Sequence, residues 1–252
     1  MVKDYLVREL QKDSAYLFPL RLFIGVGWIR ASLEKFIEAG WHDGSSLMAF
    51  FDQQITGNRV AFPFYRALIQ DLFAPHALAL SWMIMIGQLL VGMCILVGLL
   101  TNFALLCGLF MNFNFIFAGE VTPSAFYIVI QMALFISNAG AIIGTDQFLS
   151  RKIAFCVLIA QPDSNRRTLW VERATFLTIA ILSLGAAFYA IPYIRDYSPH
   201  SVDDPAMILL VLSIIIGLSA LITWMRFQTM TGFKDLPSAT PVHNPDFRRG
   251  QK

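Results

Sequence analysis

The stretch MNFNFIFAGEVTPSAF, from Met111 to Phe126, joins two long apolar runs and decides how they pack. The polar segment 119–122 has room only for a tight turn, so the flanking runs are expected to be antiparallel neighbours. Pro123 suits the first turn of the second helix, where a missing N–H is tolerated. Asn112 and Asn114 are two residues apart, so they point to different sides of one helix and are expected to contact different neighbours.

The composition is that of a membrane protein. The chain has 252 residues, of which 56% are hydrophobic and 14% are charged, whereas soluble domains carry about 25% charged residues. The apolar residues are gathered into runs of about 17–25 residues, which is enough to cross about 30 Å of hydrocarbon. The basic residues are divided among the loops, which argues against a nucleic-acid partner. We therefore expect an all-α integral membrane protein.

Six runs are predicted to cross the membrane, at 17–37, 77–100, 102–118, 123–144, 172–192 and 206–225. The first four are expected to form an antiparallel four-helix transmembrane bundle within residues 1–151. Residues 152–171 would be a cytoplasmic connector, whose apolar run IAFCVLIA is too short to span. Residues 172–225 would form a C-terminal transmembrane hairpin. The polar, Pro-containing tail 226–252 is predicted to be cytoplasmic and disordered.

Lysine and arginine placement predicts the orientation. With six spans, 13 lysines and arginines fall in segments on the side of the N-terminus and 4 on the other side, while Arg21 and Arg30 lie within the first span. Cytoplasmic segments carry the excess of positive charge, so both termini are predicted to be cytoplasmic. The long outer loop contains PFYRALIQDLF, from Pro63 to Phe73, which is predicted to be a short helix that lies in the membrane interface or covers the mouth of the bundle.

The first span carries charges at helical spacing. Arg21, Trp28 and Lys35 recur on one helix face, and Arg30 and Glu34 form an i,i+4 pair that can be a salt bridge. Charged residues inside a membrane are expensive and often functional. The alternatives are that Arg21 and Lys35 are interfacial anchors, with Arg21 snorkelling at the inner edge, and that the Arg30–Glu34 pair is purely structural.

The other spans carry amides. Ser124, Gln131 and Asn138 recur every seven residues and predict a polar seam, which must face protein or a water-lined cavity because lipid cannot satisfy amides. Simple helix packing is the alternative for the seam and for Gln88 in the second span. Glu120 lies at the outer mouth. Together these residues predict a cavity that opens outward and is roofed by the loop 38–76.

Several cofactors are not expected. The four histidines, His42, His76, His200 and His243, lie outside the spans, so no bis-histidine haem is predicted. No Cys/His cluster predicts an iron–sulfur cluster or another metal site, and no flavin or nicotinamide motif is present. A redox function would then use a diffusible carrier such as a membrane quinone, whose ring needs an aromatic slot with a few hydrogen-bond donors.

Three segments resemble the DoxX/DoxD family of small bacterial and archaeal membrane proteins. They are RLFIGVGWIRASLEKF (21–36), IGQLLVGMCILVGLLTNFALLCG (86–108) and NFNFIFAGEVTPSAFYIVIQMALFISNAGAIIGTDQFLSR (112–151). The resemblance covers residues 16–151 and implies a four-helix membrane bundle in a bacterial or archaeal plasma membrane. The chain departs from the family pattern at Glu34, where a glycine commonly precedes the lysine, and residues 152–252 lie outside the family core.

Within that family the chain is most similar to the DoxD membrane subunits of thiosulfate:quinone oxidoreductase. The resemblance implies oxidation of thiosulfate to tetrathionate, reduction of quinone and a small partner subunit. From their depth and helix face, we predict catalytic roles for Arg30, Glu34, Lys35 and Glu120, and quinone contacts for Arg21, Trp28, Gln88, Asn112, Gln131 and Asn138. The alternatives are a non-catalytic scaffold for soluble redox enzymes, or a small-molecule transporter that uses the polar seam.

Overall fold

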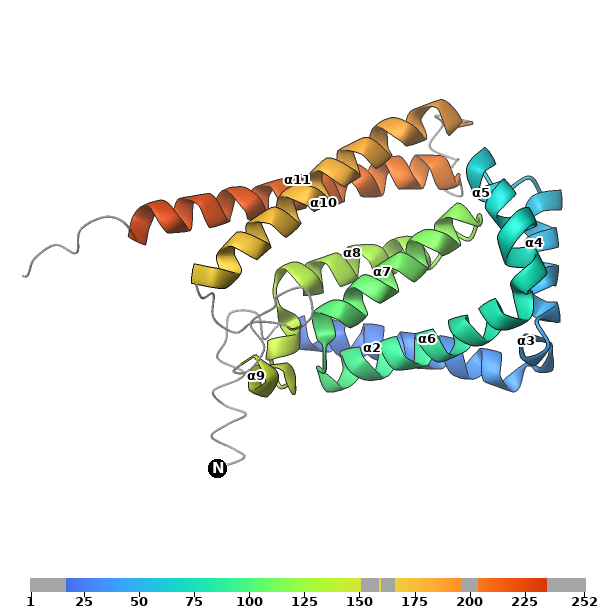
Figure 1. The fold of residues 1–252 in the computed structure, drawn as a ribbon, viewed down its shortest axis with the longest axis horizontal. Coiled ribbons are helices and arrows are strands. Elements are labelled where there is room, and N and C mark those ends of the chain that lie inside the picture. The colour runs from blue at the N-terminus through green and yellow to red at the C-terminus, as the bar shows by residue number, and fades with distance from the viewer. Residues whose placement is uncertain (1–16, 151–158, 160–165, 196–203, 235–252) are drawn as a thin grey trace, which may run out of the picture.

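The computed structural model describes residues 17–150, 159, 166–195 and 204–234, with the backbone alone described at 141, 166–172 and 226–234. Every regular element in these residues is a helix (Figure 1). The elements are α2 (Phe18–Ile37), α3 (Ala39–His42), α4 (Ser45–Thr56), α5 (Pro63–Leu68), the π-helical turn η2 (Ile69–Phe73), η3 (Ala74–His76), α6 (Ala77–Val97), α7 (Thr101–Phe117), α8 (Ser124–Ile136), η4 (Ala139–Ala141), α9 (Asp146–Leu149), α10 (Arg166–Ala190), η5 (Ile191–Tyr193) and α11 (Pro205–Lys234).

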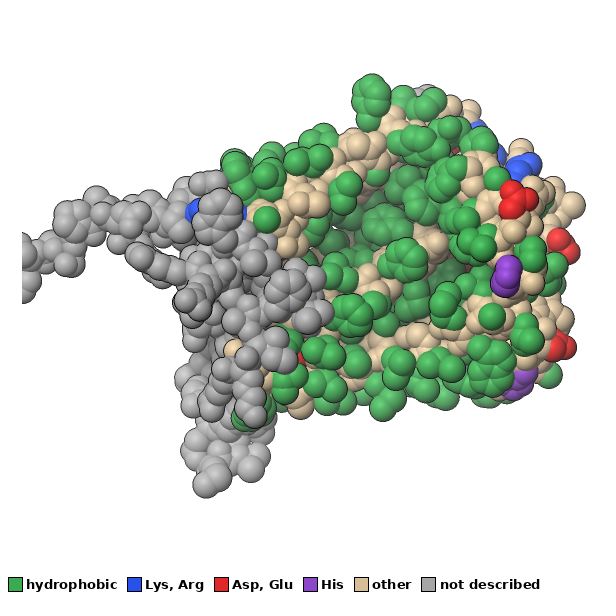
Figure 2. All heavy atoms as spheres, viewed as in Figure 1, with side chains coloured by type: hydrophobic (Ala, Val, Ile, Leu, Met, Phe, Trp, Pro, Cys, Tyr) green, Lys and Arg blue, Asp and Glu red, His purple; other side chains and the backbone are tan. Residues whose placement is uncertain are grey.

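The chain is a helical membrane protein. Three described helical segments are long and apolar enough to cross a bilayer, namely Pro63–Val97, Arg173–Tyr193 and Pro205–Met225. Two further apolar helices, α7 and α8, are shorter. Figure 2 shows hydrophobic side chains over the visible sides of the helices, while most visible charged and histidine side chains lie near α4.

Helices α2, α6, α7 and α8 form a bundle in which consecutive helices run antiparallel (Figure 1). The short helices α3, α4 and α5 lie across one end, which we call the α4 end, and α9 lies at the opposite α9 end. Helices α10 and α11 form a hairpin that contacts the bundle through α7 and α8. The predicted segment from Pro63 to Phe73 is confirmed as α5 and η2, with Tyr65 and Ile69 buried.

Glycines bring α2 and α6 into close contact. A Cβ added at Gly92 would lie 2.7 Å from Ile29 Cγ1 and 2.8 Å from Gly25 O, so the backbones touch there. Small residues at such crossings let helices approach closely, as in other membrane bundles. The buried face of α2 comprises Arg21, Ile24, Gly25, Trp28 and Ser32, which confirms the predicted polar face. On the other faces of α2, Val26 and Leu33 are exposed.

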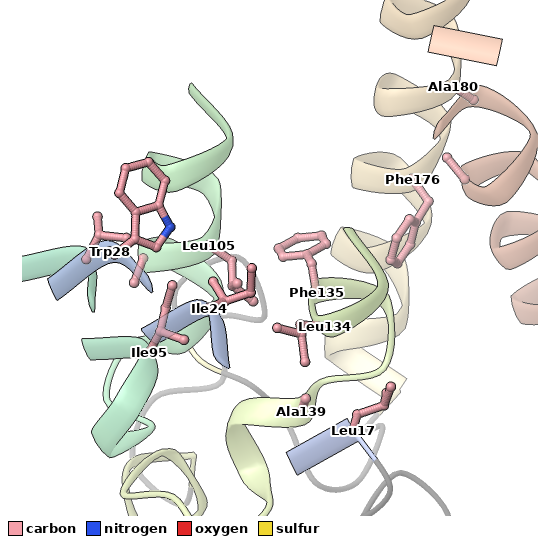
Figure 3. Close-up of a cluster of buried hydrophobic side chains, with 13 residues drawn as sticks. Leu17, Ile24, Trp28, Ile95, Leu105, Leu134, Phe135, Ala139, Phe176 and Ala180 are labelled. Atoms are coloured by element: carbon pink, nitrogen blue, oxygen red, sulfur yellow. The ribbon is translucent and has the colours of Figure 1, made fainter. Parts of the chain in front are cut away.

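An apolar cluster fills the bundle between its two ends (Figure 3). Ile24, Leu105 and Leu134 are fully buried in it and come from α2, α7 and α8. Phe135 and Phe176 join the bundle to the hairpin, because their ring centroids lie 6.1 Å apart in an edge-to-face contact between α8 and α10.

The structure corrects three predicted boundaries. Helix α8 ends at Ile136 rather than continuing to 144, because Asn138 adopts a left-handed φ of 51°. Helix α10 begins at Arg166, inside the predicted connector, and α11 continues to Lys234, inside the predicted disordered tail. Residues 152–158, 160–165 and 235–252, including most of the run IAFCVLIA, lie outside the described residues.

Substitution of Gly92 by Ala is expected to destabilise the bundle. The new methyl group meets the α2 backbone, and overpacking of this kind costs about 1–3 kcal/mol. Thermal unfolding in detergent, followed by circular dichroism, measures the effect as a lower midpoint. Gly185→Ala is the matched control, since nothing lies within 4 Å of a Cβ at Gly185, and it should leave the midpoint unchanged or raise it. Equal effects of the two substitutions would contradict the close α2–α6 contact.

Candidate functional site

A cavity of about 340 Å³ lies inside the α4 end of the bundle, and we call it the interior pocket. This volume is at the lower end of the range of about 300–1,000 Å³ found for small-molecule sites. The pocket is lined by Trp28, Ala31, Lys35, Trp41, Leu47, Phe50, Gln88, Asn112, Phe115, Glu120, Pro123, Ser124 and Tyr127. All four bundle helices and the α7–α8 turn therefore contribute walls, while α3 and α4 supply the roof.

The interior pocket brings together residues that were predicted separately. Trp28 and Lys35 reach it from α2, Gln88 from α6, Asn112 from α7, and Glu120 from the α7–α8 turn. Gln131 lies behind the lining, where its Oε1 accepts a hydrogen bond of 2.9 Å from Asn112 Nδ2. The predicted roof from the loop 38–76 is present as Trp41, Leu47 and Phe50.

Three buried polar atoms beside this pocket have no hydrogen-bond partner among the described residues. They are Trp28 Nε1, Gln88 Oε1 and Gln131 Nε2, and none of the three side chains is more than 2% exposed. An unsatisfied buried polar group costs about 1–3 kcal/mol. Such groups need an explanation in a native structure, and a ligand that supplies the missing partners is one.

Two of these unpartnered donors converge because Gly108 has no side chain. A Cβ at Gly108 would clash with Gln131 Nε2 and would lie 3.3 Å from Trp28 Nε1. The indole of Trp28 also makes an edge-to-face contact with Tyr127, with the ring centroids 6.1 Å apart. The site therefore combines N–H donors with aromatic walls.

Lys35 and Glu120 give the interior pocket its charge. Lys35 Nζ donates to Ala31 O at 3.2 Å and lies 5.0 Å from the centre of the Trp41 ring, a distance at which cation and ring attract. Glu120 is half-buried and also lines a second cavity, of about 340 Å³, which we call the mouth pocket. Glu120 thus borders both cavities.

The mouth pocket is polar and lies where three connections meet. They are the α4–α5 loop with Arg59, the α7–α8 turn with Glu120, and the α10–α11 connection with Arg195 and Asp204. Arg195 N donates to Asp204 Oδ2 at 3.0 Å, and Arg195 Nη1 donates to Asn58 O. The pocket offers two arginines and two carboxylates to a solute.

Arg21 and Asn138 lie away from the interior pocket, so the structure does not bring them together with the other predicted quinone contacts. Arg21 is fully buried at the α9 end and donates to Ala139 O, Ile142 O and Ile143 O at 2.9, 2.5 and 3.0 Å. It does not snorkel, because the irregular chain after α8 turns its carbonyls toward α2. Asn138 Oδ1 accepts from Asn102 Nδ2 at 3.2 Å at the same end.

Arg30 and Glu34 form the predicted salt bridge, at 2.8 Å, but on the surface of α2. Their side chains are 80% and 60% exposed, and they line an open groove with Tyr127 and Pro123 rather than the interior pocket. The sequence predicted catalytic roles for both residues. Their i,i+4 spacing shows that they pair, but it does not show which face of the helix turns inward.

The two asparagines of the stretch from Met111 to Phe126 contact different neighbours, as predicted. Asn112 binds Gln131, whereas Asn114 Oδ1 accepts from Tyr65 OH at 3.0 Å and Asn114 Nδ2 donates to Phe110 O at 2.7 Å. Two lining residues, Tyr127 and Trp41, were not among the predicted site residues. Tyr127 precedes Gln131 by one helical turn, a spacing that places both on one face.

No family model, no curated protein and no solved structure matches this chain. The fold and the interior pocket define its class as a helical membrane protein with a ligand-sized cavity at one end of its bundle.

The Asn112–Gln131 hydrogen bond is expected to couple α7 to α8. Asn112→Leu leaves Gln131 Oε1 unsatisfied and should lower the free energy of unfolding by about 1–3 kcal/mol, whereas a change of both partners to Leu and Met should cost less than the sum of the single changes. Unfolding of the two single variants and the double variant in detergent gives the coupling free energy. A coupling of zero would contradict this contact.

Proposed function

We propose that this protein is the membrane subunit of a quinone-linked oxidoreductase that takes electrons from thiosulfate. The observation that carries the proposal is the interior pocket, which combines aromatic walls with the side chains of Lys35, Gln88 and Glu120 and has unpartnered buried polar atoms beside it. Quinone carbonyls are acceptors, and the flat ring fits between aromatic side chains. The resemblance of residues 16–151 to the DoxX/DoxD family supports the same reading.

The residues present fit a quinone head. Trp28 and Gln88 line the pocket and carry N–H groups that can donate to a carbonyl, and Lys35 offers a cation on the same wall as Trp28. Trp28, Phe115 and Tyr127 supply the aromatic sides. When bound, the quinone would supply the two-electron acceptor of the reaction. The protein's part is then to orient the ring, exclude water and hold charge beside the carbonyls.

The mouth pocket is the proposed approach for thiosulfate and protons. Two thiosulfate dianions release two electrons as a sulfur–sulfur bond forms in tetrathionate, and a quinone takes up two electrons and two protons. Arg59 and Arg195 can attract the dianion, and Glu120 borders both cavities, so it can pass protons between them. A small partner subunit or a soluble redox enzyme would assist the electron transfer.

The proposal includes a membrane arrangement. All six helices α2, α6, α7, α8, α10 and α11 would cross the plasma membrane of a bacterium or archaeon, as a bundle and a hairpin. The α4 end would then face outward, and both termini would be cytoplasmic. The distribution of lysines and arginines supports this orientation, and it gives thiosulfate access from outside the cell.

Thiosulfate-dependent reduction of a quinone analogue by the purified protein, with any copurifying subunits, tests the function. We expect turnover in the native protein and a loss of about tenfold in quinone affinity for Gln88→Leu, which removes a polar contact to the head. Gln53→Leu is the matched control, because Gln53 is exposed on α4. Absence of turnover and of quinone binding would exclude the proposal, and copurification of a soluble enzyme without quinone would favour a scaffold instead.

Glu120→Gln is expected to slow quinone reduction without weakening quinone binding. The amide cannot carry a proton, and loss of a positioned proton-transfer group typically reduces rates about 10²-fold or more. Single-turnover kinetics at several pH values measure the rate, and equilibrium titration measures the affinity. Glu120→Asp should restore part of the rate. An unchanged rate in Glu120→Gln would show that protons take another route.

A further inference from the structure

A third cavity adjoins the interior pocket and differs from it in chemistry. It has a volume of about 140 Å³ and lies between α4, the α5–η2 segment, α6 and α7. Leu47, Phe50 and Phe115 line both cavities, so the two share a wall. We call this cavity of about 140 Å³ the side cavity.

The polar groups of the side cavity are already satisfied. Its lining is otherwise hydrophobic, and its two polar side chains, Tyr65 and Asn114, bond to each other at 3.0 Å, while Asn114 Nδ2 bonds to Phe110 O. The interior pocket, in contrast, is lined by the charged side chains of Lys35 and Glu120 and by the amide of Gln88. The interior pocket therefore suits a polar group of a ligand, and the side cavity suits an apolar group.

The side cavity also reaches the apolar surface of the bundle. Met83 on α6 and Phe110 on α7 line it and are 63% and 69% exposed, respectively. In a membrane these side chains would face lipid. An apolar chain can therefore leave the bundle between α6 and α7 without passing a charged or unsatisfied group.

From this pair of cavities we propose that the ligand is a long-tailed, lipid-soluble quinone, with its head in the interior pocket and its hydrocarbon tail in the side cavity. The tail passes Leu47, Phe50 and Phe115 and emerges into the bilayer between α6 and α7. This inference rests on the proposed quinone function and adds the class of quinone and its route. It implies that the quinone reaches the site from the membrane rather than from water.

Tail length alone would test this poorly, because lipid is as apolar as the cavity and the tail gains little by moving between them. The sharper test fills the side cavity. Leu80→Trp adds bulk to its α6 wall, and overpacking should weaken binding of a long-tailed quinone about tenfold or more. Binding of a tail-less quinone with the same head should stay within about twofold.

Leu90→Trp is the matched control, because Leu90 is 56% exposed on the same helix and outside the side cavity. It should change neither affinity. Gln88→Leu should weaken both ligands, since it alters the head site. Ile84→Phe fills the same cavity with a smaller change and replaces Leu80→Trp if that variant does not fold. Titrations in lipid nanodiscs, with quinone content expressed per lipid, give the affinity of each variant for each of the two quinones.

The outcomes separate the two proposals. If neither quinone binds the native protein, the proposed function fails. If both bind and the cavity-filling variants leave the affinity for the long-tailed quinone unchanged, or lower both affinities equally, the function stands and this inference fails. A photoreactive group on the quinone tail should label Met83 or Phe110. Labelling confined to α10 and α11 would also overturn the proposed route of the tail. A phospholipid that occupies the side cavity and is not displaced by the quinone would overturn it as well.

Discussion

The rest of the bundle depends on the hydrogen bonds that Arg21 donates to three carbonyl oxygens at the α9 end. It ties the start of α2 to the irregular chain that follows α8, and so fixes the first helix against the fourth. Trp28 and Lys35 lie two and four turns farther along α2, so their position in the interior pocket follows from that anchor. The buried guanidinium is stable there because the three carbonyls replace the hydrogen bonds that it would make to water.

Much of the bundle was predictable, because helix spacing and turn length are local properties of the chain. The antiparallel order of α6, α7 and α8 follows from short connections, and the different partners of Asn112 and Asn114 follow from their spacing. Five predicted residues, Trp28, Lys35, Gln88, Asn112 and Glu120, do line one pocket. The helical spacing of these residues, or their depth in the predicted spans, could be read from the sequence.

The remaining features depend on contacts between distant segments. The role of Arg21 was hidden because its acceptors lie more than a hundred residues away, in a segment whose seven-residue polar period resembled a continuing helix. The end of α8 at Ile136 separates Asn138 from the seam. Helical spacing pairs Arg30 with Glu34 but does not say that the pair faces outward. The apolar roof from α4 depends on how the long loop folds back, which no local pattern specifies.

The length of α11 has a consequence of its own. Its apolar run is followed by the charged Arg226, yet the helix continues to Lys234. At a rise of 1.5 Å per residue, this extension is about 13 Å long, and an apolar part of 21 residues already matches the hydrocarbon thickness. In a bilayer that the apolar part spans, the extension would project beyond the hydrocarbon. Lys234 would then lie at a fixed distance from the lipid, as at the end of a rigid spacer.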